Sequence, residues 1–161
     1  MSTTNRRPRL LDLFCGAGGC AVGYHRAGFD VVGVDHRKQP RYPFDFVRGN
    51  ALAPPFDLRD FDVIHASPPC QRYSIAANIA GADSHPDFVA ATRGLLQASG
   101  RIYVIENVPR APLLDAITVC GLSVGCGVKR HRLFESNAVL TGTQCPAGHR
   151  PVDALPRRHR L

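Results

Sequence analysis

The stretch that decides the fold runs from Arg9 to Ala21 and reads RLLDLFCGAGGCA. Its first half, up to Phe14, is an apolar run with the length and composition of a buried strand. A glycine-rich turn of the form G-x-G-x-x-A begins at Gly16, where glycines permit a tight turn and a close approach of a ligand. Asp35 stands nineteen residues later, at the end of the next apolar run. This order predicts a strand, turn and helix that bind an adenosyl or dinucleotide cofactor, although a purely structural turn has the same form.

The rest of the chain alternates short apolar runs with helix-like stretches, which is typical of an α/β fold with a parallel sheet. Pro86 is expected in the first turn of the second helix, with Ser84 or His85 near its cap. Between 37 and 60 the sequence predicts at most a short strand, around 46–47. The other expected strands are 9–14, 31–34, 61–66, 101–105, 117–120 and 133–136, and the expected helices end near 27 and span 87–98.

Basic residues outnumber acidic ones and gather in three places. The 161 residues include 20 Lys and Arg against 13 Asp and Glu, a formal net charge of +7. Arginines crowd both ends of the chain, and a third basic group, Lys129-Arg130-His131-Arg132, leads into apolar residues. Such a balance favours a polyanionic partner, although basic termini alone fit solvated tails equally well.

Length and hydropathy predict one cytoplasmic domain. A chain of 161 residues is long enough to bury a single core. No apolar run approaches the ~18 residues that a membrane span needs. The basic start of the chain is not followed by an apolar segment of signal-peptide length.

The six cysteines are scattered, and none belongs to a C-x-x-C pair. Cys145 and His149 have the only Cys/His spacing that resembles half of a metal site. Because no second pair lies nearby in the sequence, we expect free thiols and no metal ion.

A proline-framed cysteine, in Ser67-Pro68-Pro69-Cys70-Gln71, follows the strand expected at 61–66. The two prolines fix φ and remove backbone donors, so they hold Cys70 in a defined place at a strand end. A thiol held there is well presented as a nucleophile if cationic or hydrogen-bonding neighbours favour the thiolate. Taken alone, the motif fits a structural cysteine better.

Glu106 is one of only two glutamates in the chain and follows the apolar strand expected at 101–105. It should therefore enter a partly desolvated site, which suits proton sharing with a substrate; the alternative is a structural acid in a salt bridge. Ligands bind beyond the carboxyl ends of strands in open α/β sheets. Four segments are expected to converge there, namely 14–19, 35, 67–71 and 106–107.

Together, four segments resemble the signatures of the DNA (cytosine-5) methyltransferases, in that family's order. They are Asp12 to Gly19 (DLFCGAGG), Pro69-Cys70-Gln71, Glu106-Asn107-Val108 and Arg130-His131-Arg132. The resemblance covers 12–134, which is most of the chain. It implies a Rossmann-like class I S-adenosylmethionine-dependent methyltransferase fold, with a mostly parallel sheet and helices on both faces.

The resemblance assigns a first group of residues to the cofactor S-adenosyl-L-methionine. Phe14 would stack on the adenine, and Asp35 would bind the ribose. Asn50 stands where the family has an acidic residue for the adenine amine, and it would accept that hydrogen bond without charge. The full set is Phe14, Gly16, Ala17, Gly18, Gly19, Asp35, Asn50 and Pro69.

A second group would act on double-stranded DNA with a flipped-out cytosine. Cys70 would add to C6 of the base and make C5 nucleophilic toward the methyl group. Glu106 would bind the N3 edge and the exocyclic amine. Arg132 would contact the base carbonyl with Arg130 beside it, and Asn107 would brace the loop of Cys70. The implied reaction is transfer of a methyl group to C5 of cytosine.

The chain departs from the family near its end. Only 27 residues follow Phe134, and they hold no counterpart of the family's target-recognition region or later segments. Val128 also replaces the glutamine that commonly precedes the basic cluster. We therefore expect a catalytic domain at 1–137 and a basic tail at 138–161, a vestige of the target-recognition region. The enzyme would be a short or truncated member of phage or restriction–modification type, or one that another chain completes.

Three alternatives stay open at this point. A catalytically impaired remnant would bind DNA or cofactor without turnover. An RNA cytosine-5 methyltransferase would share the four signatures. A nicotinamide-dependent oxidoreductase would use the turn at 16–21, but it leaves the segments around Cys70 and Glu106 unexplained.

Overall fold

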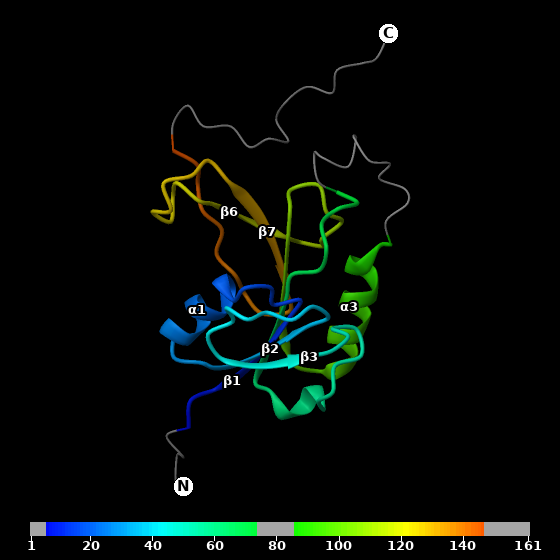
Figure 1. The fold of residues 1–161 in the computed structure, drawn as a ribbon. Helices are drawn as coiled ribbons and strands as arrows, with labels where there is room; N and C mark the ends of the chain where they lie inside the picture. The colour runs from blue at the N-terminus through cyan, green and yellow to red at the C-terminus, as the bar shows by residue number, and fades with distance from the viewer. Residues whose placement is uncertain (1–5, 74–85, 147–161) are drawn as a thin grey trace, which may run out of the picture.

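The computed structural model describes residues 6–73 and 86–146, and these contain seven strands and two α-helices (Figure 1). The strands are β1 (Arg9–Leu13), β2 (Asp30–Asp35), β3 (Asp45–Arg48), β4 (Val63–Ala66), β5 (Ile102–Asn107), β6 (Ile117–Cys120) and β7 (His131–Ser136). The helices are α1 (Gly19–Arg26) and α3 (Phe88–Ser99), and a short 3-10 turn, η1 (Leu58–Asp60), precedes β4.

All seven strands belong to one sheet, in the order β3-β2-β1-β4-β5-β7-β6. The strands from β3 to β5 are parallel, whereas β7 runs antiparallel to both β5 and β6. Leu133 of β7 therefore lies opposite Asn107, the last residue of β5. The carboxyl ends of β1, β2, β4 and β5 meet the start of β7 at one edge of the sheet. In folds of this kind that edge is where ligands bind.

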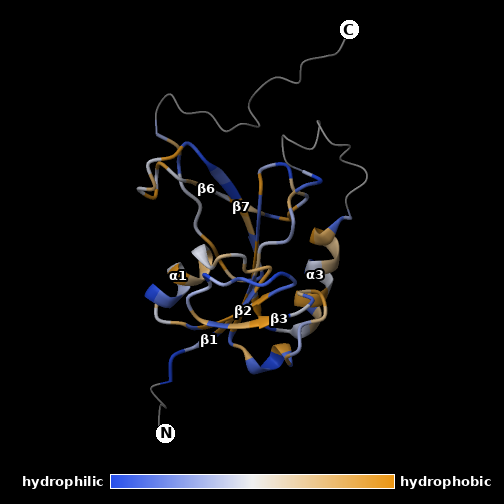
Figure 2. Cartoon of the chain, in the orientation of Figure 1, coloured by the Kyte–Doolittle hydropathy of each residue, from blue (hydrophilic) through white to orange (hydrophobic). Residues whose placement is uncertain are grey.

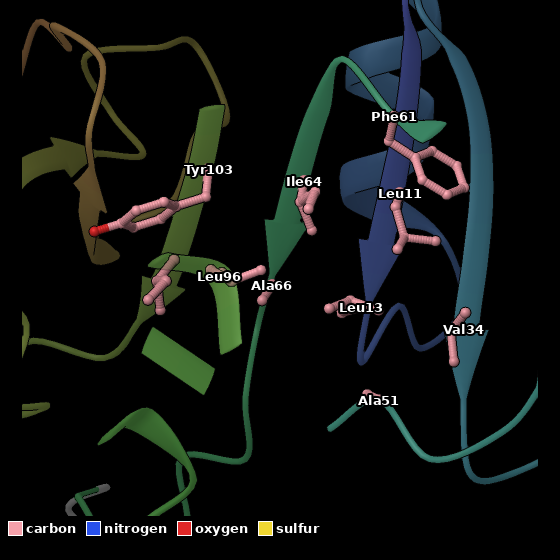
Figure 3. Packing of buried hydrophobic residues seen from close by; sticks show 10 residues of the cluster. Leu11, Leu13, Val34, Ala51, Phe61, Ile64, Ala66, Leu96 and Tyr103 are labelled. Carbon is pink, nitrogen blue, oxygen red and sulfur yellow. The ribbon is translucent and has the colours of Figure 1, made fainter. Parts of the chain in front are cut away.

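Both faces of the sheet are covered, because successive side chains of a strand point to opposite faces. Leu11 and Leu13 of β1 belong to a buried cluster with Leu96 of α3 (Figure 3). Leu10, on the other face, belongs to a second cluster with Ala21 of α1. The predicted α/β fold with helices on both faces is thereby confirmed. The near-continuous apolar sequence of β1 follows from burial on both sides.

The predicted elements are found, with differences of one or two residues at most of their ends. The short strand expected around 46–47 is β3. β7 begins at His131, two residues earlier than predicted, because its pairing with β6 continues to the partners Cys120 and His131. No helix within the two described ranges is long and apolar enough to cross a membrane.

The start of α3 differs from the prediction. Asp87 is the N-cap, and its carboxylate accepts hydrogen bonds from the backbone N–H groups of Val89 (3.0 Å) and Ala90 (3.3 Å). Pro86 therefore precedes the cap instead of occupying the first turn. Asp87 is favoured as the cap because its side chain satisfies backbone donors that have no partner within the helix. Ser84 and His85, the residues expected near the cap, lie outside the described residues.

The hairpin of β6 and β7 extends from the end of the sheet, and the chain after it runs back beside β6 (Figure 1). β7 begins with hydrophilic residues, and hydrophobic residues follow in its middle (Figure 2). The Thr143 N–H donates to the Thr118 carbonyl at 2.9 Å, and the Cys120 N–H donates to the Thr143 hydroxyl at 2.7 Å. The chain that follows the boundary expected at 137 is thus hydrogen-bonded to β6 at Thr143.

Candidate active site

A pocket of about 260 Å³ lies at the edge where the carboxyl ends of the parallel strands meet. Its wall draws on the ends of β1, β2, β4 and β5 and on the start of β7. The lining residues are Phe14, Asp35, His36, Ser67, Pro68, Pro69, Cys70, Gln71, Glu106, Asn107, Val108 and Arg132. All four segments that were expected to converge therefore contribute to one cavity, which combines aromatic, carboxylate, thiol and guanidinium groups.

Asp35 holds the glycine turn against the end of β2. Its Oδ2 accepts a hydrogen bond from the Gly16 N–H at 3.1 Å, and its Oδ1 accepts one from the Arg37 N–H at 2.9 Å. A carboxylate has more acceptor sites than these two donors use, so Asp35 can also bind hydroxyl groups in the pocket. Phe14, at the start of the turn, adopts a left-handed φ of 57°, which is uncommon for a residue other than glycine.

Cys70 stands in a loop that is tied to two strands. The buried Asn107 donates from Nδ2 to the Pro68 carbonyl at 2.9 Å, a contact between β5 and the loop of Cys70. The Ser67 N–H donates to the Leu13 carbonyl at 3.2 Å, so the loop leaves β4 beside the end of β1. Cys70 itself is half-buried and lines the pocket.

Glu106 and Arg132 form an ion pair in the wall of the pocket. The Nε of Arg132 lies 2.7 Å from Oε1 of Glu106, and the two side chains are 25% and 21% exposed. The pair forms because β5 and β7 are antiparallel neighbours. The sequence offered two alternatives for Glu106, an acid in a ligand site or an acid in a salt bridge. The two do not exclude each other, because Glu106 lines the pocket and is paired with Arg132.

Several of the predicted site residues lie outside the pocket wall. Asn50 is exposed, and its Oδ1 accepts a hydrogen bond from the Leu52 N–H at 3.0 Å within a local turn. Arg130 is exposed in the hairpin loop, whereas Arg132 lines the pocket. The turn residues 16–19 adjoin Phe14 in the chain but are not part of the lining.

One lining residue belongs to none of the segments that the sequence singled out. His36 follows Asp35, and its Nδ1 lies 3.2 Å from a carboxylate oxygen of that residue. Its position directly after a predicted strand-end residue is the signal that points to it. Val108, the last residue of the signature around Glu106, also lines the pocket.

A buried histidine lies beneath the loop of Cys70. His65 on β4 is 1% exposed, and burial lowers its pKa to about 4. Its Nε2 lies 2.9 Å from the Ser67 hydroxyl and 3.4 Å from the Cys20 sulfur, and its Nδ1 lies 3.1 Å from the Tyr24 hydroxyl. Because the ring is neutral near pH 7, one nitrogen donates and the other accepts. These contacts tie the start of the loop to α1.

The sequence from residue 8 to residue 115 matches the family model of the C-5 cytosine-specific DNA methylases. The chain belongs to this family. The match includes three of the four segments that carried the resemblance, up to the one around Glu106. It confirms that resemblance and argues against the alternative of a nicotinamide-dependent oxidoreductase.

Two curated relatives of the chain are Type II methyltransferases. M.XorII of Xanthomonas oryzae pv. oryzae is 30% identical, over 80% of this chain and 31% of its own length. M.AgeI of Thalassovita gelatinovora is 26% identical, over 78% of this chain and 38% of its own length. The chain therefore spans about a third of the length of the curated relatives it matches.

A solved structure supports the assignment of the fold. The 1,6-didemethyltoxoflavin-N1-methyltransferase of Burkholderia thailandensis matches with a TM-score of 0.53 at 14% identity, over 81% of this chain and 70% of that one. At that level of identity the likeness concerns the fold alone. The chain has the Rossmann-like fold of class I methyltransferases, as the resemblance implied.

Proposed function

We propose that the chain transfers a methyl group from S-adenosyl-L-methionine to C5 of cytosine in double-stranded DNA, with Cys70 as the nucleophile. One observation carries the proposal: Cys70, Glu106 and Arg132 line the same pocket as Phe14 and Asp35. A thiol, an acid and a cation thus share a cavity with an aromatic ring and a carboxylate suited to an adenosine. Family membership and the Type II relatives favour DNA of a restriction–modification system as the substrate.

The pocket has groups that fit the cofactor. Phe14 offers a ring for an adenine, and Asp35 keeps acceptor capacity for the two ribose hydroxyls after binding two backbone N–H groups. Gly16 has a φ of +51° and open space where a Cβ would stand, so the backbone can approach a ligand closely. When bound, the cofactor supplies an electrophilic methyl group on a sulfonium centre.

Cys70 would start the reaction by forming a bond from its sulfur to C6 of a flipped-out cytosine. The electron pair of the C5–C6 double bond then becomes available at C5, which would form a bond to the methyl carbon as the bond from that carbon to the sulfonium sulfur breaks, leaving S-adenosyl-L-homocysteine. Transfer of the C5 proton to water and departure of the Cys70 thiolate from C6 would restore the ring and free the enzyme. The loop braced by Asn107 holds the sulfur in place for both bond formation and bond cleavage.

Glu106 and Arg132 would recognise the edge of the cytosine and stabilise the charge that attack creates. Glu106 would share a proton with N3 and accept from the exocyclic amine, and Arg132 would donate to the carbonyl oxygen. The 2.7 Å ion pair keeps the acid and the cation side by side before the base arrives. Exposed Lys129 and Arg130 in the neighbouring loop would bind phosphates and leave base recognition to the pocket.

The test is methyl transfer from labelled S-adenosyl-L-methionine to duplex DNA and, in parallel, to tRNA. Wild type is expected to label DNA, and Cys70→Ser to lose at least about 10³-fold of that rate. Cys126→Ser, which changes an exposed cysteine, is the matched control and should label DNA like wild type. Labelling of tRNA alone would favour the RNA-modifying alternative. Cofactor binding without transfer to either substrate would favour the impaired remnant.

A further inference from the structure

Three potential metal ligands meet at the loop end of the β6–β7 hairpin, and none of them lines the pocket. Cys120 is the last residue of β6, His131 is the first of β7, and the two are direct partners in the antiparallel register. Cys145 reaches the same place from the chain that follows β7. One ligand atom from each residue lies within 4.8 Å of the other two.

The third ligand is brought in by backbone contacts rather than by chance proximity. Thr143 pairs with Thr118 and Cys120 through the hydrogen bonds described above. The carbonyl of Gln144 accepts from the Ser123 hydroxyl at 2.5 Å. Gly142 passes so close to β6 that a Cβ there would lie 3.0 Å from the Thr118 carbonyl oxygen. Residues 142–145 therefore follow β6 as far as its end and deliver the thiol of Cys145 there.

We propose that Cys120, His131 and Cys145 bind a structural zinc ion. Two thiolates and an imidazole are a ligand set that zinc prefers, and a tetrahedral ion sets these atoms about 3.6–3.8 Å apart. The three atoms already lie within 4.8 Å of one another, and Nε2 of His131 is 2.9 Å from Sγ of Cys145. Ligation requires shifts of about an ångström or less. Cys120 and His131 are buried, so the ion would sit in a site that excludes most water.

The register of the hairpin also brings together a second Cys/His pair, which the spacing of residues in the sequence did not show. Cys145 and His149 have Cys/His spacing, but no second pair stands near them in the sequence. Cys120 and His131 form that second pair in space, across two strands. His149 lies outside the described residues.

The β6–β7 hairpin has few buried apolar contacts, so a bound metal ion would add to its stability. Among the described residues, neither of the two buried hydrophobic clusters includes a residue of β6 or β7. Small structures without a core of their own are commonly stabilised by a metal or a disulfide. An ion at this point would join β6, β7 and residues 142–145. It would thereby fix the strand start from which Arg132 reaches the pocket.

The experiment measures zinc in the full-length chain, purified without chelator and without a metal-affinity tag. Wild type is expected to hold about one zinc ion per chain. In competition with a chromophoric chelator, Cys145→Ser should lose at least about 10-fold in zinc affinity. Cobalt(II) in place of zinc should give thiolate charge-transfer absorption that weakens in the same variant.

Cys126→Ser is the control, because Cys126 is exposed in the same hairpin loop and is not one of the three ligands. It should bind zinc like wild type. Wild type without zinc, or with Cys120 and Cys145 joined as a disulfide, would overturn the proposal. Equal losses in Cys126→Ser and Cys145→Ser would overturn it as well. The measurement does not depend on methyl transfer, so it stands apart from the test of the proposed function.

Removal of the metal from wild type provides a second readout that needs no variant to fold. A strong chelator should lower the midpoint of thermal unfolding of wild type, since metal binding contributes to folding. The same treatment should leave the midpoint of Cys145→Ser almost unchanged. An equal response of both proteins would contradict a zinc site at these residues.

Discussion

Arg132 and Glu106 contact each other at 2.7 Å, although they stand on different strands and are 26 residues apart in the sequence. Their meeting depends on the reversal of direction at β7, the first antiparallel strand beside the parallel part of the sheet. The reversal brings the start of β7 to the edge at which the parallel strands end. The antiparallel strand β7 thus supplies the guanidinium group of Arg132 to a pocket that is otherwise lined from the parallel strands and the loops after them.

Arg132 and Arg130 should respond differently to substitution by alanine. Arg132 lines the pocket and Arg130 is exposed in the loop. Arg132→Ala is expected to lower kcat by about 10²-fold, because it removes a donor at the site of developing charge. Arg130→Ala should leave kcat nearly unchanged but reduce the slope of log K against log salt for DNA binding by about one. Equal effects of both substitutions on kcat would contradict this division of roles.

Asn107 is expected to act as a positioning residue for Cys70. Asn107→Ala leaves the Pro68 carbonyl without its 2.9 Å donor and should reduce the free energy of unfolding by about 1–3 kcal/mol. Methyl transfer should slow while the affinity for S-adenosyl-L-methionine changes little. Asn107→Asp keeps the size of the side chain but removes the amide donor, so it should also slow transfer. Full activity of Asn107→Asp would show that the bond to Pro68 is not needed.

The buried ion pair of Arg93 and Glu135 should dominate the stability of the half of the sheet around β7. Two oxygens of Glu135 lie 2.7 and 2.8 Å from guanidinium nitrogens of Arg93, and the side chains are only 14% and 4% exposed. Because one charge would be left buried without its partner, Glu135→Gln should lower the free energy of unfolding by about 3–5 kcal/mol at neutral pH. Asp57→Asn, which breaks an exposed ion pair with Arg59, should change the stability little.

The same pair predicts how stability depends on pH. Burial opposes the ionisation of Glu135, but the hydrogen bonds from Arg93 and the Leu114 N–H outweigh it and hold the pKa below its ordinary value. The stabilisation is therefore complete above the unfolded-state pKa and is lost as the pH falls through the folded-state pKa. Urea unfolding of wild type and Glu135→Gln should give free energies that converge in acid. A constant difference down to low pH would contradict the assignment.

Ionisation of Asp12 should lower the free energy of unfolding as the pH rises, whereas ionisation of Glu135 should increase it at lower pH. Burial raises its pKa to about 7, although a hydrogen bond from the Tyr42 hydroxyl at 3.3 Å favours ionisation. Because the folded protein holds this proton more tightly than the unfolded chain, stability falls as the pH rises from about 4 to about 7. Asp12→Asn keeps an acceptor for Tyr42 and removes the titration. Its free energy of unfolding relative to wild type should rise across this range, and a flat difference would contradict the prediction.

The parallel half of the fold is predictable from the sequence because each of its elements has a local signal. The apolar runs of β1, β2, β4 and β5, and the glycine turn before α1, are enough to place Phe14, Asp35, Cys70 and Glu106 at strand ends. The rule that ligands bind at those ends then brings the four residues together. Predicting these positions requires only the order of the strands and helices along the chain, and not the details of their packing.

The features that the sequence did not reveal depend on pairing and on competition between neighbouring polar groups. The cluster of Cys120, His131 and Cys145 arises from the register of β6 with β7, which no local pattern encodes. Asp87 is preferred as the α3 cap over the residues before it because its carboxylate reaches two backbone donors. Asn50 turns its Oδ1 to a nearby N–H and not to the pocket.

The most direct test of the central claim is covalent capture of Cys70 by a cytosine. A DNA duplex that carries 5-fluorocytosine at its target sites offers no C5 proton to lose, so the adduct between sulfur and C6 should accumulate once the methyl group has been transferred. With S-adenosyl-L-methionine present, mass spectrometry should find the chain bound to DNA, and digestion should locate the bond at Cys70. Cys126→Ser should form the adduct and Cys70→Ser should not. An adduct that persists in Cys70→Ser, or none in a wild-type protein that binds both DNA and cofactor, would contradict the mechanism.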